Sequence, residues 1–222
     1  MIVLVTLASL RQTAPFGVTG MCRHCRLHED LGSGVNPMIK RTADILISAI
    51  FLLGLAPLLL VIATLVRLDS PGPALFRQER VGRDGARFWM LKFRSMVREA
   101  PHLGGYSTAP GDPRITRSGL WLRRTSLDEL PQLINVLRGD MSLVGPRPDV
   151  PAQRSQYSEA QWRLRHRVRP GLTGLAQATV RSDATAEQRT NLDLQYVAQH
   201  SLGLDLWILL VTLRQLLMRG SH

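Results

Sequence analysis

The segment from Ile45 to Val66 constrains the fold more than any other part of the chain, because it contains no charged residue. At about 1.5 Å per residue, a continuous helix over this segment is about 33 Å long, which is enough to cross the hydrocarbon core of a bilayer. A buried core helix fits less well, since no polar face interrupts the run. The segment therefore predicts insertion into a membrane.

These residues alone leave open how the segment enters the membrane. Pro57 lies just past its middle and removes the amide that would bond the carbonyl of Leu53, which kinks or breaks a helix. Basic residues flank both ends, so a spanning helix places one set against the positive-inside bias, whereas a re-entrant helix–break–helix keeps both sets on the cytoplasmic side. Spanning helices also tolerate proline. The pattern thus favours re-entry over a span.

The composition indicates a folded protein with anionic partners. The 222 residues are 45% hydrophobic, and 28 basic against 17 acidic side chains give a net charge of +11. All the basic residues except Lys40 and Lys92 are arginines, whose planar guanidinium suits phosphate oxygens. A nucleic-acid-binding protein is disfavoured, because aromatic residues make up only 5% and the uncharged segment would stay unexplained.

We expect the chain to divide at both ends of the membrane segment. Residues 1–37 lack the features of a secretory signal and form an N-terminal extension that we expect to be poorly ordered. In this extension, Cys22 and Cys25 do not provide the four ligands of a structural zinc site. Residues 38–69 form the membrane module, and residues 70–222 form a domain outside the bilayer.

The patterns after the membrane module predict an α+β domain that is mostly helical. The runs 74–78 and 86–93 favour the strands of a β-hairpin, and the residues from Pro101 to Pro113 favour a loop. Leucines from 127 to 137 follow helical spacing, and Ser126 with Glu129 matches a capping box. The stretch 191–218 predicts an amphipathic helix, and its pattern fits an interfacial helix and a core-packing helix about equally.

The adjacent acids Asp128 and Glu129 are the strongest candidates for chemistry. Two carboxylates among arginines suit a divalent cation handled together with phosphate, because Mg²⁺ binds through one or two carboxylates plus substrate phosphate. An aspartate beside a helix N-terminus is also stabilised as an anion and available as a nucleophile. On spacing alone, a glutamate that caps the helix is the commoner explanation.

Arg147 is the strongest candidate for a phosphate contact. It stands between two prolines in the run Gly139–Pro148, and proline limits the freedom of the backbone. Arg147 is therefore held in place, as a phosphate clamp requires. The alternative is a rigid surface turn with a solvated arginine.

Several motifs follow one another in the order of a known family. They are Lys40-Arg41-x-x-Asp44, the broken apolar segment, Phe76–Gly82, Lys92–Met96, Thr125–Leu133, Gly139–Pro148 and Arg169–Gly174. Each motif is moderately specific, and the ordered set is highly specific. From Lys40 to Arg214 the chain strongly resembles the bacterial sugar transferases that are monotopic phosphoglycosyl transferases.

The resemblance implies transfer of sugar-1-phosphate from a UDP-sugar to undecaprenyl phosphate, with release of UMP. This is the first membrane step in the assembly of a bacterial exopolysaccharide, O-antigen, capsule or glycoprotein glycan. Asp128 becomes the nucleophile that forms a covalent aspartyl phosphosugar, and Glu129, with Asp128, becomes the Mg²⁺ ligand. The implied contacts with phosphate, nucleotide-sugar or lipid phosphate are Lys40, Arg41, Arg94, Arg123, Arg147 and Arg181.

The resemblance also implies an architecture and a location. The membrane helix is re-entrant and broken at Pro57, and amphipathic helices lie at the interface. Residues 70–222 form the catalytic domain on the cytoplasmic face of the bacterial inner membrane, with membrane lipids as partners and no nucleic acid. A homodimer stays open.

The chain departs from the family pattern after Gly174. The family usually has Trp-Ala-Gln and then an Asn-Gly-Arg-like triplet, where this chain has Leu175-Ala176-Gln177 and Thr179-Val180-Arg181. These differences leave the donor sugar open. The alternative to an enzyme is a catalytically inactive, membrane-anchored relative that acts as a scaffold.

Overall fold

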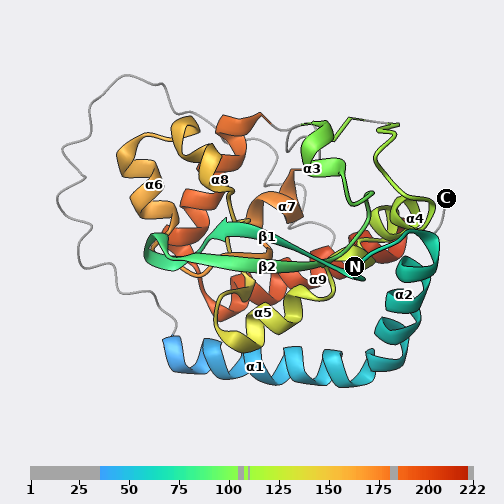
Figure 1. The fold of residues 1–222 in the computed structure, drawn as a ribbon. Coiled ribbons are helices and arrows are strands. Elements are labelled where there is room, and N and C mark those ends of the chain that lie inside the picture. Colours follow the sequence, from blue (N-terminus) through green and yellow to red (C-terminus); the bar gives the residue numbers. More distant parts are fainter. Residues whose placement is uncertain (1–35, 105–107, 110, 181–184, 220–222) are drawn as a thin grey trace. The chain divides into compact units, whose positions relative to one another are not determined.

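The computed structural model describes residues 36–104, 108–109, 111–180 and 185–219, and within them the chain is α+β and mostly helical (Figure 1). This confirms the predicted fold class. Residues 1–35 of the N-terminal extension, with Cys22 and Cys25, lie outside the described residues, as does Arg181, and α1 begins one residue before the predicted membrane module. The longer helices are α1 (Pro37–Gly54), α2 (Ala56–Asp69), α4 (Arg117–Thr125), α8 (Ala186–Gln199) and α9 (Leu202–Arg219).

Shorter elements connect and complete this frame. The short helices are α3 (Ala100–Leu103), α5 (Gln132–Arg138), α6 (Glu159–Arg165) and α7 (Leu175–Thr179), and the 3₁₀ turns are η3 (Arg83–Gly85), η4 (Leu127–Glu129) and η5 (Pro151–Gln156). The strands are β1 (Leu75–Val81), β2 (Arg87–Phe93), β3 (Ser142–Val144) and β4 (Gly171–Thr173), paired as two separate sheets.

The uncharged segment forms two helices. α1 ends at Gly54 and α2 begins at Ala56, with a bend of 64° between them. Pro57 lies in the first turn of α2, where its missing amide costs no helical hydrogen bond. The predicted break is thus confirmed, at Leu55 just before the proline. Among the described helices, no single one is long and apolar enough to cross a membrane, and α1 with α2 meets that test only as a bent pair.

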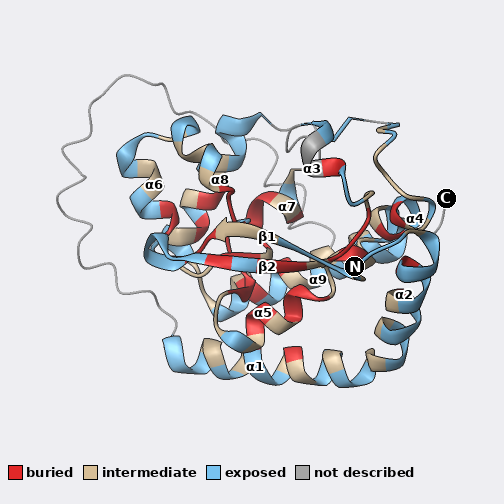
Figure 2. Ribbon diagram, in the orientation of Figure 1, coloured by how far each residue is buried: buried red, intermediate tan, exposed pale blue. Residues whose placement is uncertain are grey.

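Both helices of this pair expose apolar side chains. α1 buries polar side chains, as its inward red and outward blue in Figure 2 illustrate, whereas the residues buried in α2 are apolar. Leu53 of α1 is 78% exposed and Leu60 of α2 is 71% exposed, whereas Asp44 is buried. The Asp44 carboxylate accepts hydrogen bonds from Ser142 Oγ at 2.8 Å and from the Leu143 amide at 3.2 Å. Polar bonds therefore fix the inner side of α1, and its outer side is apolar.

The predicted hairpin is confirmed, with a longer first strand than expected. β1 and β2 pair antiparallel, with Leu75 opposite Phe93 and Val81 opposite Arg87. In the turn, Asp84 has a φ of 56° and Gly85 a φ of 79°, a left-handed conformation that glycine adopts without strain.

β3 and β4 pair in parallel inside the main hydrophobic core. A Cβ on Gly171 would lie 2.1 Å from the Gly145 amide nitrogen, so only glycine permits the chain to approach this closely. The contact fixes the loop that follows β3 against the start of β4. Fully buried side chains around these strands include Met90, Val136, Met141, Tyr196 and Ile208.

The stretch expected to form one amphipathic helix forms two, because α8 ends at Gln199 and α9 begins at Leu202. α9 combines the two predicted alternatives. Its buried side carries Ile208 and Asp205, which pack into the core, whereas its outer side exposes leucines. These are Leu206, Leu210, Leu213 and Leu217, which are 54–70% exposed and recur at helical spacing.

Candidate functional site

Asp128 and Glu129 lie in η4, the 3₁₀ turn between α4 and α5. The predicted capping box at Ser126 is wrong, because Ser126 ends α4 in a left-handed conformation (φ 58°) and its side chain makes no cap hydrogen bond. Pro131 stands at the N-cap position of α5. The expectation that both acids lie beside a helix N-terminus is confirmed.

Glu129 is held by two cations from separate parts of the chain. Its Oε1 accepts hydrogen bonds from Lys92 Nζ and from Arg147 Nη2, each at 2.7 Å. Lys92 lies near the end of β2, and Arg147 lies in the loop after β3. Burial alone would raise the pKa of Glu129, but the charges of Arg147 and Lys92 hold it well below its usual range. Glu129 is therefore a fixed carboxylate.

Asp128 has a different environment. It is only 8% exposed, and among the described residues no hydrogen bond reaches its carboxylate. Burial raises the pKa of Asp128, and Lys92 opposes that shift. A poorly solvated carboxylate with no hydrogen bond is available to a ligand or a reacting atom, as a nucleophile must be.

Arg123 of α4 approaches the same region through Ser95. Its Nε donates to Ser95 Oγ at 2.8 Å, and its charge acts to lower the pKa of Asp128. α4 packs closely here because residue 119 is glycine, where a Cβ would lie 2.1 Å from the Ser95 carbonyl oxygen. The structure thus brings Arg123, Asp128, Glu129 and Arg147 into one cluster.

Lys40 and Arg41 do not join this cluster. Lys40 Nζ pairs with the Asp205 carboxylate, and Arg41 donates to the carbonyls of Val136 at 2.7 Å and Leu137 at 3.0 Å, at the end of α5. These bonds fasten α1 to α9 and α5. In this structure both cations hold α1 in place, whereas the resemblance had assigned them to lipid headgroups or substrate.

Arg94 does not join the cluster either, although the resemblance had assigned it to substrate. It is 5% exposed, and its guanidinium donates to the carbonyls of Ser70 at 2.7 Å, Val66 at 3.2 Å and Pro71. It therefore closes the turn between α2 and β1. From the same motif, it is Lys92 that reaches the acids.

Sequence reasoning missed two members of the site, Lys92 and Arg80. Arg80 Nη1 donates to the Pro148 carbonyl at 2.7 Å, and burial together with the charge of Arg147 lowers the pKa of Arg80 to about 10. Both residues lie in motifs that carry the family resemblance. The available signal for Lys92 was its identity, because it and Lys40 are the two lysines of an arginine-rich chain.

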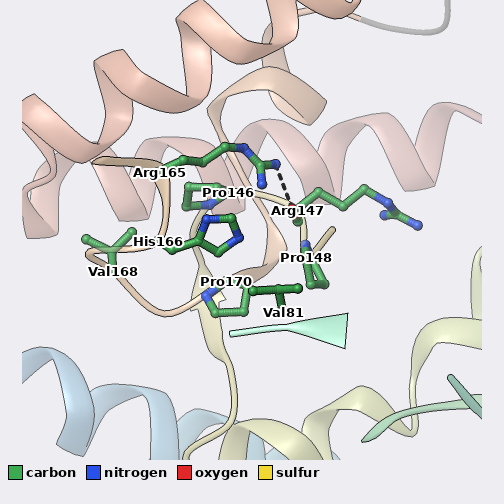
Figure 3. Close-up of a pocket in the computed structure, with 8 residues that line it drawn as sticks. All are labelled: Val81, Pro146, Arg147, Pro148, Arg165, His166, Val168 and Pro170. Atoms are coloured by element: carbon green, nitrogen blue, oxygen red, sulfur yellow. Dashed lines mark hydrogen bonds between the residues drawn. The ribbon is translucent and has the colours of Figure 1, made fainter. Parts of the chain in front are cut away.

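The loop that carries Arg147 packs around a small cavity (Figure 3). The cavity measures about 10 Å³, room for about one water molecule. Its lining comprises Val81, Pro146, Arg147, Pro148, Arg165, His166, Val168 and Pro170. The Arg147 side chain extends away from the ring of His166 and the prolines (Figure 3). The cavity is thus the packed support behind Arg147, and it is too small for a nucleotide-sugar.

The acid pair fits a cation that is shared with a substrate. Among the described residues, no group of three or more His, Cys, Asp and Glu side chains is placed to hold a metal ion. Mg²⁺, however, commonly binds through one or two carboxylates and completes its shell with water and substrate phosphate. Both hydrogen bonds of Glu129 fall on Oε1, which leaves its Oε2 and the Asp128 carboxylate as oxygen donors.

Comparison with known proteins identifies the family of the chain. Residues 35–219 match the family model described as bacterial sugar transferase. A relative from Rhizobium leguminosarum bv. phaseoli, named exopolysaccharide production protein PSS, is 44% identical over 195 residues, which cover 83% of this chain and 98% of that protein. That match extends over nearly the whole of the relative.

Two longer relatives carry names that include different sugars. The UDP-glucose:undecaprenyl-phosphate glucose-1-phosphate transferase of Escherichia coli (strain K12) is 46% identical over 188 residues, covering 81% of this chain and 40% of that protein. The UDP-N-acetylgalactosamine-undecaprenyl-phosphate N-acetylgalactosaminephosphotransferase of Aeromonas hydrophila is 39% identical over 210 residues, covering 90% of this chain and 50% of that protein. The chain therefore spans half or less of the length of these two relatives.

Proposed function

The chain belongs to the bacterial sugar transferase family, and we propose that it transfers sugar-1-phosphate from a UDP-sugar to undecaprenyl phosphate, releasing UMP. The observation that carries the proposal is the contrast within the acid pair. Glu129 is fixed by Lys92 and Arg147, whereas Asp128 beside it is buried and has no hydrogen bond to its carboxylate among the described residues. This contrast supports a binding role for Glu129 and a reacting role for Asp128.

In the first step, a carboxylate oxygen of Asp128 attacks the β-phosphorus of the UDP-sugar. The bond from that phosphorus to the bridging oxygen breaks, and UMP leaves with the electron pair. Asp128 then carries the sugar phosphate as an acyl phosphate, the aspartyl phosphosugar. Arg147 and Arg123 face the phosphate oxygens, whose negative charge their guanidinium groups offset.

In the second step, a phosphate oxygen of undecaprenyl phosphate attacks the same phosphorus. The bond to Asp128 breaks, the carboxylate is regenerated, and the product is undecaprenyl diphosphate sugar. Two steps keep the diphosphate donor and the phosphate acceptor from occupying the site together, which avoids the repulsion between two anions. No proton has to move for either step to balance.

Asp128 and Glu129 would hold Mg²⁺ through the carboxylate oxygens that are not used by Lys92 and Arg147. When bound, the cation supplies positive charge to the diphosphate and its leaving group. Removal of divalent cations with a chelator is expected to stop UMP release, and added Mg²⁺ is expected to restore it. Turnover that persists in chelator contradicts the metal assignment.

The outer surfaces of α1, α2 and α9 support a location at the membrane. Leu53, Leu60 and Leu217 are 70–78% exposed, and such exposed apolar side chains favour a lipid environment. A re-entrant α1–α2 pair keeps residues 70–222 on the cytoplasmic face of the inner membrane, where the UDP-sugar is available. The lipid acceptor then reaches the site from the bilayer.

The place of the reaction in the cell follows from its product. A sugar on undecaprenyl diphosphate is the primer to which further sugars are added, so we place the chain at the first membrane step of a bacterial glycan. The name of the Rhizobium relative favours an exopolysaccharide. Relatives named for glucose and for N-acetylgalactosamine leave the sugar to experiment.

The deciding experiment measures UMP release from a panel of UDP-sugars, with undecaprenyl phosphate in lipid nanodiscs. We expect release that requires the lipid phosphate and that is lost in Asp128→Asn. The sugar that supports release identifies the donor. Absence of release with every sugar favours the alternative, an inactive membrane-anchored scaffold.

A further inference from the structure

The direction of the Arg147 side chain depends on the backbone that carries it. That side chain is 48% exposed, and it reaches Glu129 from the loop after β3. The backbone carbonyls of this loop accept hydrogen bonds from arginine side chains. Arg80 donates to the Pro148 carbonyl at 2.7 Å, and Arg165 Nη2 donates to the carbonyl of Arg147 itself at 2.7 Å (Figure 3).

Arg165 is held in turn by two carboxylates. It is the last residue of α6, and its side chain is 4% exposed. Its Nε and Nη2 donate to Asp193 Oδ2 of α8 at 3.0 and 2.8 Å, and its Nη1 pairs with Asp149. Asp149 lies in the Arg147 loop, so one guanidinium ties this loop to α6 and α8.

Stability is a weak explanation for this buried cluster. Two carboxylates face one guanidinium, and burial lowers the pKa of the neighbouring His166, which is therefore neutral at neutral pH. Asp193 Oδ1 is buried and has no hydrogen-bond partner in the described part of the chain. Buried ion pairs often contribute no more stability than apolar side chains of the same volume. What the cluster does provide is a fixed position for the Arg147 carbonyl.

We propose that Arg165 is a positioning residue that directs the Arg147 guanidinium toward Glu129 and the donor phosphates. Arg165 acts only through Arg147, because it touches the backbone of that residue and lies behind the loop. The catalytic consequence rests on the proposed function, whereas the geometric claim rests on the contacts of Arg165 alone.

A double-mutant cycle on turnover tests the catalytic consequence. Arg165→Met is expected to lower kcat by about 10- to 100-fold, the loss typical of a misplaced catalytic contact. In an Arg147→Met background, the same substitution is expected to change kcat less than about twofold, because the group it positions is gone. Equal losses in both backgrounds would overturn the proposal.

Two further variants guard against misfolding. Arg165→Lys keeps a cation between Asp149 and Asp193 but lacks the fork that reaches both carboxylates and the carbonyl. We expect it to fold and to show the same dependence on Arg147. Arg163→Met, on the exposed side of the same helix, is the matched control and is expected to retain wild-type kcat.

An NMR spectrum of the arginine Nε–H groups tests, without turnover, whether Arg165 sets the direction of the Arg147 side chain. The Arg147 signal is assigned by its absence in Arg147→Met, in protein held in nanodiscs. We expect it to shift and broaden in Arg165→Lys and to stay unchanged in Arg163→Met. An Arg147 signal that Arg165→Lys leaves in place overturns the proposal. If wild-type protein releases no UMP, the proposed function fails, and this spectrum still decides the role of Arg165.

Discussion

Two sets of carboxylates in this protein differ in how their oxygens are used. On the buried side of α1, the Asp44 carboxylate accepts hydrogen bonds on both oxygens, from Ser142 and Leu143. On the buried side of α9, the Asp205 carboxylate also accepts on both oxygens, from Lys40 and Tyr196. In η4, Glu129 uses only Oε1, and the Asp128 carboxylate has no hydrogen bond among the described residues.

This difference separates the structural acids from the acids that we propose for chemistry. A carboxylate with a hydrogen bond from the protein on each oxygen is held in one orientation and has fewer lone pairs left for a metal ion or a phosphorus atom. A carboxylate that is buried without such bonds costs stability, which a folded protein tolerates where function requires it. Burial alone does not distinguish the two sets, because Asp44, Asp205 and Asp128 are all 5–8% exposed.

The same substitution in the two sets gives the sharpest contrast. Asp128→Asn is expected to lower turnover by at least about 10³-fold, because the amide cannot form the phosphosugar bond. Asp44→Asn is expected to cost about 1–3 kcal/mol in the free energy of unfolding, since it leaves the Leu143 amide or Ser142 without its acceptor. The test measures, for both variants, the turnover rate per folded molecule and the thermal unfolding. Similar turnover losses in the two variants would remove the distinction.

Lys92 and Arg94 allow the same comparison within one motif. Lys92→Met is expected to lower kcat/KM by about 10- to 100-fold, because Glu129 loses one of its two cations. Arg94→Met is expected to destabilise the fold by about 2–3 kcal/mol, because three carbonyls lose their donor. Steady-state kinetics in nanodiscs and a denaturation curve separate the two effects. A larger kinetic loss for Arg94→Met would reverse the assignment.

The outer surface of α9 provides a test on the membrane side. Leu210 is 57% exposed, so Leu210→Glu leaves the core intact and places a charge on the surface that we assign to lipid. In a flotation assay with vesicles of anionic lipid, we expect a smaller bound fraction of this variant. The free energy of partitioning into the vesicles is expected to weaken by about 2–3 kcal/mol. Glu79, on the hairpin away from α9, provides the control Glu79→Gln, which is expected to float like the wild type. Unchanged flotation of Leu210→Glu argues against contact of α9 with lipid.

The smallest expected effect is on how the free energy of unfolding depends on pH in alkaline solution. Burial and the nearby Asp205 raise the pKa of Tyr196 above its usual value. The unfolded chain therefore releases this proton first, near pH 10, so the unfolded state binds fewer protons and the free energy of unfolding falls as pH rises above about 10. Tyr196→Phe is expected to be less stable at pH 7 and to lose less stability between pH 9 and pH 11. An equal slope in wild type and variant contradicts this linkage.

The sequence predicted the elements well where a local pattern decided them. The break near Pro57 and the hairpin follow from proline and from turn residues. Predictions failed at two helix ends. Ser126 ends α4 instead of capping α5, and the stretch 191–218 divides into two helices.

The site was predictable in its acids and less so in its cations. Asp128, Glu129 and Arg147 come together as expected, because short motifs carry them. Arg94, Lys40 and Arg41 bond within the protein, and no pattern of residues reveals which backbone carbonyls need a donor. Lys92 reaches the acids because η4 lies beside β2, a contact that the fold creates.

The account depends most on Asp128 as the nucleophile. Wild-type protein in nanodiscs without undecaprenyl phosphate is incubated with the UDP-sugar that supports turnover, then digested and examined by mass spectrometry. We predict a mass increase equal to one sugar phosphate on the peptide that contains Asp128, lost when the lipid acceptor is added and absent in Asp128→Asn. Turnover by Asp128→Asn, or the adduct on another residue, would contradict the account.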